Sequence, residues 1–177
     1  DIILPLAFKR IFEQTLAPRL PPAVRAEMLA AGYDRKAKRV PRHASIFYAC
    51  AEIARKHLYP DLPPREGFRT MARDSAFAGK YDIAARTFTH PLCRFLGPTV
   101  LVRDYVSIIQ QVRPTIEMAI LDGKGPPFRL RVRCVYSNAG MMAGGLEGLL
   151  QVRARVKTAT VAIENEHEMG YDLVVNW

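Results

Sequence analysis

Cysteine is scarce in this sequence, and hydrophobic runs are short. The three cysteines, Cys50, Cys93 and Cys134, lie far apart without a C-x-x-C spacing. This argues against a disulfide framework and against a cysteine-based zinc site. No stretch approaches the roughly 18 apolar residues of a membrane span, and none has the charged-then-apolar pattern of a signal peptide. We therefore expect reduced thiols in a cytoplasmic protein without a transmembrane segment.

Histidine is also scarce, and its spacing matches no metal-binding motif. Neither H-x-x-x-H nor H-E-x-x-H occurs among the four residues His43, His57, His90 and His167. A Cys93–His90 pair of nucleophile and base is conceivable, but Pro91 disturbs the helical geometry between them. His167 lies in an acidic run that could hold a cation if folded tightly, although a solvated hairpin turn is the simpler interpretation. The sequence predicts no catalytic residue, no metal site and no cofactor.

The charge is strongly basic, with 26 Lys and Arg against 17 Asp and Glu and a net charge of +9. Such a balance favours acidic partners, including nucleic acid, nucleotides and anionic lipid. The densest basic cluster, residues 35–42, lies in a connection between helices. Nucleic-acid surfaces interleave aromatic with basic residues, whereas most aromatic residues here occupy core-facing positions. Nucleotide or nucleic-acid binding is therefore kept as an alternative only.

The first 113 residues have helical periodicity, interrupted by proline and glycine. Apolar residues recur at three- and four-residue intervals in about six segments, with breaks where proline or glycine starts or ends a helix. We expect helices over 4–16, 23–31, 41–58, 65–78, 81–88 and 99–112, with a kink near Thr89-His90.

After Pro114 the pattern changes to that of strands. Strands are predicted over 115–121 and from Phe128 onward, joined by a turn over 122–127, and again over 156–164 and 171–177, joined by a turn over 165–170. A helix lies between the two hairpins. We expect one α+β domain over 1–177, with a helical part (1–113) followed by a β-β-α-β-β antiparallel sheet unit with its crossing helix (114–177).

Three arginines alternate with apolar residues in the second predicted strand. Arg129, Arg131 and Arg133 share one face, because side chains on a strand alternate between faces. Three guanidinium groups in a row can hold a phosphate or a carboxylate through paired hydrogen bonds. The alternative is a solvated face partly neutralised by Glu117 and Glu164 on neighbouring strands.

The helix between the hairpins, residues 140–150, has glycines on one side and large apolar residues on the other. Gly140, Gly144 and Gly148 oppose a stripe made by Met142, Leu146, Leu149 and Leu150. Each interior glycine costs about 1 kcal/mol relative to alanine, so we expect close packing on the glycine side. A chain segment, a second subunit or a ligand could provide it. Glu147, the only charge, either pairs with an arginine or lies at a subunit interface.

Five stretches resemble an uncharacterised paralogous family best known from myxobacteria. They cover nearly the whole chain in a specific order and spacing: FKRIF at 8–12, LAPRLPP at 16–22, LYPDLPP at 58–64, RFLGP at 94–98 and GGLEGLL at 144–150. That family resembles, more distantly, the haem-NO-binding, 4-vinyl-reductase-like and transport-particle (TRAPP) domains. The resemblance implies helices followed by a strand-strand-helix-strand-strand end.

The wider group implies either a pocket for haem, small hydrophobic effectors or acyl chains between helices and sheet, or a role as an assembly subunit. The haem-NO-binding pattern requires an axial histidine on the helix before the sheet and a Tyr-x-Ser-x-Arg grip on the haem propionates. Residues 99–113 contain no histidine, and Tyr136-Ser137-Asn138 departs from that grip. We therefore expect that this chain binds no haem.

Three hypotheses of function follow. The first is a non-enzymatic regulatory or signalling module that binds a small hydrophobic ligand between helices and sheet, in a pocket lined by Tyr105, Ile109, Tyr136, Met141 and Met142. The second is an assembly subunit that forms a homodimer, or binds another protein, through Gly140, Gly144 and Gly148 or through a sheet edge. The third is an anion, nucleotide or nucleic-acid binder that uses Arg129, Arg131 and Arg133.

Overall fold

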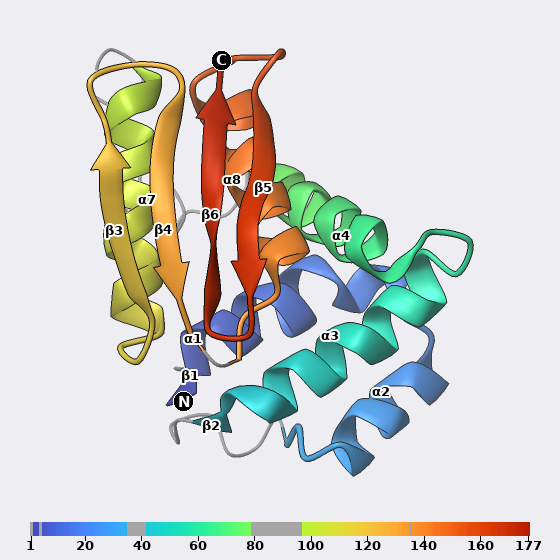
Figure 1. Ribbon diagram of the computed structural model, residues 1–177. Coiled ribbons are helices and arrows are strands. Elements are labelled where there is room, and N and C mark those ends of the chain that lie inside the picture. The colour runs from blue at the N-terminus through green and yellow to red at the C-terminus, as the bar shows by residue number, and fades with distance from the viewer. Residues whose placement is uncertain (1, 4, 35–41, 79–96, 135) are drawn as a thin grey trace.

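The structure, a computed structural model, consists of a four-stranded sheet backed by helices, with a second group of helices at one end of the sheet (Figure 1). It describes residues 2–3, 5–34, 42–78, 97–134 and 136–177. The predicted α+β class is confirmed, since the helical part comes first and the sheet unit last. The predicted helix over 81–88, the kink near Thr89-His90 and most of the basic connection lie outside the described residues.

The N-terminal part is built mainly from helices. The predicted first helix is a composite, because a π-helical stretch, η1, and a short 3-10 turn, η2, continue α1. The bounds are α1 Pro5–Phe8, η1 Lys9–Thr15, η2 Ala17–Arg19, α2 Pro22–Ala30, α3 Ala44–Leu58, α4 Pro64–Ala78 and α7 Pro98–Val112. Two short strands, β1 (Ile2–Ile3) and β2 (Arg42–His43), pair antiparallel ahead of α3.

Proline and glycine punctuate these helices as the sequence predicts. Pro22, Pro64 and Pro98 are each the first helical residue, where the missing N–H group costs no intrahelical bond. Gly32 follows α2 with φ of 97°, a backbone conformation that favours glycine. None of the helices in the described stretches is long and apolar enough to cross a bilayer.

The sheet has the strand order β3-β4-β6-β5, and all of its pairs are antiparallel. Its strands are β3 Glu117–Asp122, β4 Phe128–Arg133, β5 Thr160–His167 and β6 Gly170–Asn176, and α8 (Ala139–Arg153) connects β4 to β5. Strand β5 extends past the predicted turn start, because an irregularity between Glu164 and His167 places Asn165 at φ of 50° and lets pairing resume at His167.

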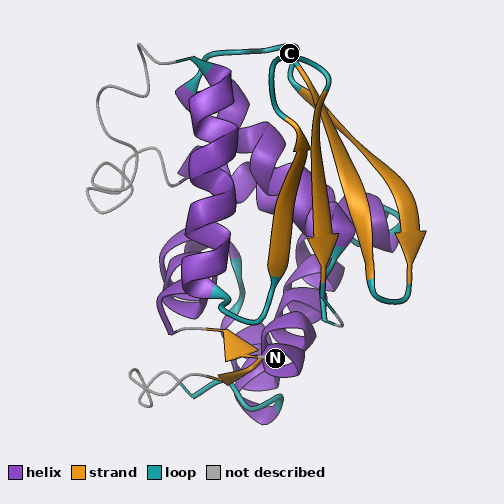
Figure 2. Cartoon of the chain, turned by 60° about the vertical axis from the view of Figure 1, so that its left-hand side comes forward, coloured by secondary structure: helices purple, strands orange, loops and turns teal. Residues whose placement is uncertain are grey.

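Helices α7 and α8 cover one face of the sheet, as Figure 2 shows from the side. The core between them combines inward residues of all four strands with apolar residues of both helices: Met118, Phe128, Leu130, Val132, Val161, Leu173, Val175, Leu101, Val102, Leu146 and Leu150. A second buried cluster lies among α1, η1, α2, α3 and α4. Helix α8 joins the two clusters, since Met142 belongs to the first and Met141 to the second.

Candidate functional site

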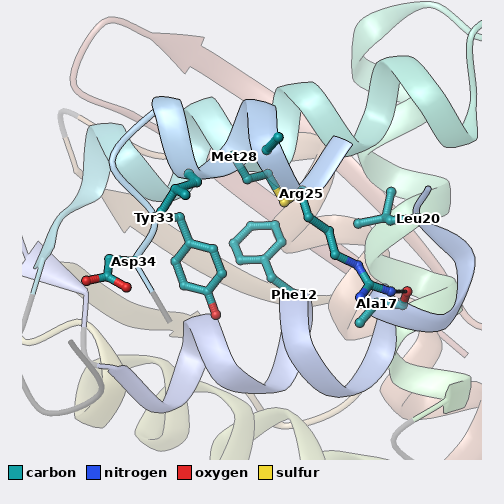
Figure 3. Close-up of a pocket in the computed structure, with 9 residues that line it drawn as sticks. Phe12, Ala17, Leu20, Arg25, Met28, Tyr33 and Asp34 are labelled. Atoms are coloured by element: carbon teal, nitrogen blue, oxygen red, sulfur yellow. Dashed lines mark hydrogen bonds between the residues drawn. The ribbon is translucent and has the colours of Figure 1, made fainter. Parts of the chain in front are cut away.

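A mostly apolar cavity lies between η1 and α2 in the N-terminal helical group (Figure 3). Its volume is about 330 Å³, and it is lined by Phe12, Ala17, Leu20, Arg25, Ala26, Met28, Leu29, Tyr33 and Asp34. Ligand pockets commonly span about 300 to 1,000 Å³ and are mostly apolar with a few polar groups. The cavity therefore has the size and composition suited to a small apolar molecule.

Contacts among the lining residues hold the cavity walls in place. The rings of Phe12 and Tyr33 lie 5.8 Å apart between centroids, and the side chain of Met28 is buried beside them. The Tyr33 hydroxyl donates a hydrogen bond to Glu13 Oε1 at 2.6 Å, which ties the end of α2 to η1. These contacts connect the two walls of the cavity directly.

The two ends of the cavity carry opposite charges. Arg25 Nη2 donates to the carbonyl oxygen of Ala17 at 2.7 Å, and Asp34 lies at the other end (Figure 3). On the rim, Leu29 is 58% exposed. The rim thus offers apolar contact area together with the Arg25 guanidinium.

The five residues predicted to line a pocket between helices and sheet do not gather around one space. Tyr105 and Met142 are buried against each other, with the Tyr105 hydroxyl donating to the Met142 carbonyl at 3.0 Å. Ile109 packs partly buried on the same core. Met141 is buried in the other cluster, and the side chain of Tyr136 is 41% exposed. Tyr105 and Met142 instead connect α7 to α8, and the five residues lie in three different environments.

Helix α4 covers the glycine side of α8. A Cβ atom at Gly140 would lie 2.6 Å from the Arg65 carbonyl oxygen, one at Gly148 would lie 2.8 Å from that of Arg73, and one at Gly144 would overlap the Arg69 backbone. The predicted close neighbour is thus a segment of the same chain. A homodimer through these glycines would first have to displace α4, so this face offers no second subunit access.

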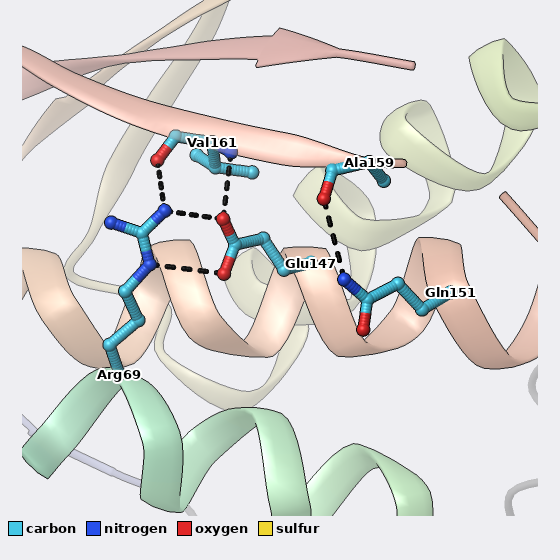
Figure 4. A network of polar contacts seen from close by, with 5 residues as sticks. All are labelled: Arg69, Glu147, Gln151, Ala159 and Val161. Atoms are coloured by element: carbon cyan, nitrogen blue, oxygen red, sulfur yellow. Dashed lines mark hydrogen bonds and ion pairs between the residues drawn. The ribbon is translucent and has the colours of Figure 1, made fainter. Parts of the chain in front are cut away.

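Glu147 pairs with an arginine, which is one of the two roles predicted for it from the sequence. Arg69 of α4 approaches its carboxylate with both Nε, at 3.0 Å from Oε2, and Nη2 (Figure 4). The same carboxylate accepts the Val161 N–H of β5 at 2.9 Å, and Arg69 donates to the Val161 carbonyl at 2.8 Å. The hydrogen bonds that Arg69 donates to the Glu147 carboxylate raise the pKa of Arg69. The pair therefore ties α4, α8 and the outer edge of β5 together.

A side chain also binds part of the backbone of β3, the strand at the opposite edge of the sheet. Gln110 of α7 donates to the Met118 carbonyl of β3 at 3.2 Å, as Gln151 of α8 does to the Ala159 carbonyl just before β5 at 3.4 Å. Unpaired strand edges are templates for association with other chains. Both edges of this sheet have part of their backbone bound by the protein's own side chains, which works against the predicted dimer through a sheet edge.

The arginine row of β4 faces away from the helices, as predicted, and carboxylates engage two of its three members. Arg129 Nη1 lies 3.0 Å from Glu164 Oε2, and Arg131 holds Asp172 through two hydrogen bonds of 2.9 and 3.2 Å. The bonds from Arg131 hold the pKa of Asp172 below its ordinary value. Glu164 neutralises part of the row as expected, whereas Glu117 lies opposite Arg133 and, in the part of the chain that the structure describes, forms no ion pair with it.

The cavity residues on α2 were not recognised in the sequence as a site. Their pattern is that of a short helix with an apolar side, in which Val24 and Met28 are buried. Leu29, next to Met28, lies outside that stripe, and a single exposed apolar residue is too common on protein surfaces to mark a site.

The family of the chain follows from its match to a family model, described as "Protein of unknown function (DUF2378)", over residues 4–177. The chain belongs to the DUF2378 family. A search of curated proteins finds no match to this DUF2378 chain.

The DUF2378 chain has the fold of H-NOX proteins. It is similar to the Fe(II) unliganded H-NOX protein from K. algicida, with a TM-score of 0.66 and 6% identity over 98% of this chain and 96% of that one. A Cs H-NOX mutant matches with a TM-score of 0.60 and 9% identity over 98% and 94% of the two chains. An H-NOX protein from S. oneidensis matches with a TM-score of 0.51 and 14% identity, over 98% of this chain and 95% of that one. The haem-NO-binding likeness inferred from the sequence is confirmed at the level of the fold.

The described residues of this DUF2378 chain do not fit the iron named for the K. algicida and S. oneidensis proteins. Helix α7, which precedes the sheet, has no histidine, and its Tyr105 fills the space toward α8 by bonding to Met142. The arginine near Tyr136 is Arg113 from the end of α7, which donates to the Tyr136 carbonyl at 2.5 Å. Within the described stretches, no group of three His, Cys, Asp or Glu side chains could hold a metal ion.

Proposed function

We propose that this DUF2378 chain is a non-enzymatic regulatory module that binds a small, mainly apolar molecule in the cavity between η1 and α2. The observation that carries the proposal is the cavity itself, about 330 Å³ with walls built from Phe12, Leu20, Met28 and Tyr33. An apolar ligand would gain about 25 cal/mol for each Å² of apolar surface it removes from water.

The fold gives this proposal independent support. Two of the H-NOX structures are described by the ligation state of their Fe(II), so the same architecture holds an iron in other proteins. We carry over the binding role and leave out the iron, because this chain lacks matching residues at α7 and after β4. The proposed ligand site lies in the helical group rather than between helices and sheet.

The test uses N-phenyl-1-naphthylamine, a neutral apolar dye whose fluorescence rises in apolar surroundings. Ala23 and Ala26 are both exposed on α2, but only Ala26 lines the cavity, so Ala26→Phe adds a ring at the cavity wall and Ala23→Phe adds the same ring away from it. Both changes cost similar helix propensity, about 0.5 kcal/mol. We expect A26F to raise the dye Kd at least fivefold and A23F to leave it unchanged. Equal dye binding by wild type and A26F contradicts the proposal.

A further inference from the structure

A polar hollow lies on the face of the sheet turned away from the helices, near the β5–β6 turn. We call it the Gly170 hollow. It has a volume of about 410 Å³ and is lined by Arg131, Arg133, Asn165, His167, Met169 and Asp172. It belongs to the strands in the foreground of Figure 1 and lies apart from the η1–α2 cavity.

The register of the sheet produces this hollow. Gly170 of β6 lies between Arg133 of β4 and His167 of β5 on one rung of the sheet. Because glycine has no side chain, the space between the arginine and the histidine stays open over two strand spacings, about 10 Å. A Cβ atom at position 170 would overlap the Val132 carbonyl.

Donors face the hollow from both sides. His167 Nδ1 accepts the Met169 N–H at 3.2 Å, which places the ring proton of the neutral imidazole on Nε2 and makes Nε2 a donor. Among the described residues, Arg133 forms no ion pair. Arg131 uses Nε and Nη2 on Asp172 and keeps Nη1 available.

The carboxylates around the hollow are mostly occupied elsewhere. Asp172 is bound by Arg131 and by Asn165 Nδ2 at 2.9 Å, Glu164 pairs with Arg129, and Glu166 pairs with Arg65. Glu117 and Glu168 are the exposed acids that remain nearby. The Arg131–Asp172 pair is neutral, and Arg133, opposite Glu117 on β3, forms no ion pair among the described residues, so its guanidinium is open to a ligand.

From this arrangement we infer that the Gly170 hollow binds the phosphate group of a small molecule. Arg133 supplies a two-point guanidinium contact and His167 supplies the Nε2–H donor from the other side. A tetrahedral phosphate presents several acceptor oxygens to donors that converge from opposite walls, whereas a carboxylate presents two in one plane. The hollow is large enough to admit the phosphate together with part of the molecule that carries it.

The experiment is an NMR titration of the ¹⁵N-labelled protein with inorganic phosphate, and in parallel with acetate, at low chloride. We expect shifts at the Arg133 Nε–H and the His167 ring, with phosphate at least tenfold tighter than acetate. Arg133→Gln should raise the phosphate Kd at least tenfold. Arg103→Gln, the same charge change on an exposed position of α7, should leave it within twofold.

A second variant separates binding from folding of the turn. His167→Asn keeps an acceptor for the Met169 N–H but loses the Nε2–H donor, so it should weaken phosphate binding about threefold to tenfold with an unchanged urea midpoint. Phosphate binding by R133Q that equals that of R103Q overturns the proposal. Acetate binding as tight as phosphate overturns the assignment to phosphate, and an absence of shifts at both side chains overturns the site.

Discussion

Arg69 of α4 and Glu147 of α8 form a two-point ion pair that also binds the N–H and carbonyl groups of Val161 in β5. Glu147 is nearly fully buried, with 4% of its surface exposed. One pair of side chains thus satisfies a strand edge and holds a helix against its neighbour.

Replacing Glu147 by leucine should lower the free energy of unfolding by about 3 kcal/mol, because it leaves a partly buried Arg69 and the Val161 N–H without their acceptor. Glu147→Gln keeps an acceptor oxygen and should cost less. Urea denaturation measures both, with Glu27→Leu as the control, since Glu27 is an exposed acid on α2. The double variant R69M/E147L should recover part of the loss. An E147L variant as stable as E27L would show that the pair does not hold α4.

Gly144 and Gly145 are neighbours in α8 with opposite expected responses to alanine. A Cβ atom at Gly144 overlaps the Arg69 backbone, whereas one at Gly145 meets only the Tyr105 hydroxyl at 3.4 Å. We expect Gly144→Ala to destabilise by about 2 to 3 kcal/mol through overpacking. Gly145→Ala should be neutral or stabilise by up to about 1 kcal/mol, because alanine favours helix. Thermal unfolding of the two variants decides, and equal midpoints would contradict the close α4–α8 contact.

Asp172 should make the protein sensitive to acid. Its pKa lies below the ordinary 3.8 because Arg131 and Asn165 donate hydrogen bonds to the carboxylate. A lowered folded-state pKa adds stability that is complete above the unfolded pKa and is lost as the pH falls through the folded one. Urea midpoints of wild type should therefore drop below about pH 4. The urea midpoint of Asp172→Asn should be lower than that of the wild type at pH 7 and should fall less on acidification. If the midpoints of the two proteins fall in parallel with pH, Asp172 is not the cause of the acid sensitivity.

Three tyrosines should resist ionisation while the protein is folded. Burial raises the pKa of Tyr48, Tyr105 and Tyr171 above the ordinary 10.0. Raised values add stability that is complete below pH 10 and is lost at higher pH, since the unfolded phenols ionise first. A spectrophotometric titration should leave Tyr105 and Tyr171, two of the seven tyrosines, protonated at about pH 11 in the folded state. Tyr105→Phe should remove one tyrosine from the ionisation step at high pH and leave the step near pH 10 unchanged.

The sequence was sufficient wherever a local pattern decides the structure. The alternation of arginine and apolar residues placed Arg129, Arg131 and Arg133 on the outer face of β4. The four-residue spacing of glycines likewise revealed that Gly144 needs a close neighbour. Such patterns identify a face but not what covers it. That α4, some 75 residues earlier, would lie on those glycines depends on long-range packing, which the periodicity of one helix does not record.

The candidate sites were harder to predict because each combines distant segments. Tyr105 and Met142 are buried in the core next to the sheet, but they contact each other where the sequence predicts a ligand. The cavity formed instead where η1 and α2 meet, beside Leu29. The Gly170 hollow depends on the rung that joins Arg133 to His167, and strand register across a hairpin with an irregularity is not readable from composition.

The carboxylate of Glu147, rather than another strand, accepts the amide proton of Val161. Hydrogen exchange at that amide therefore follows the detachment of α4 and α8 from the sheet, and it proceeds without any strand separating. This backbone position in β5 is a built-in reporter of helix docking. Small molecules that loosen or tighten the helical layer would change its exchange rate, while amides paired between β4 and β6 keep theirs.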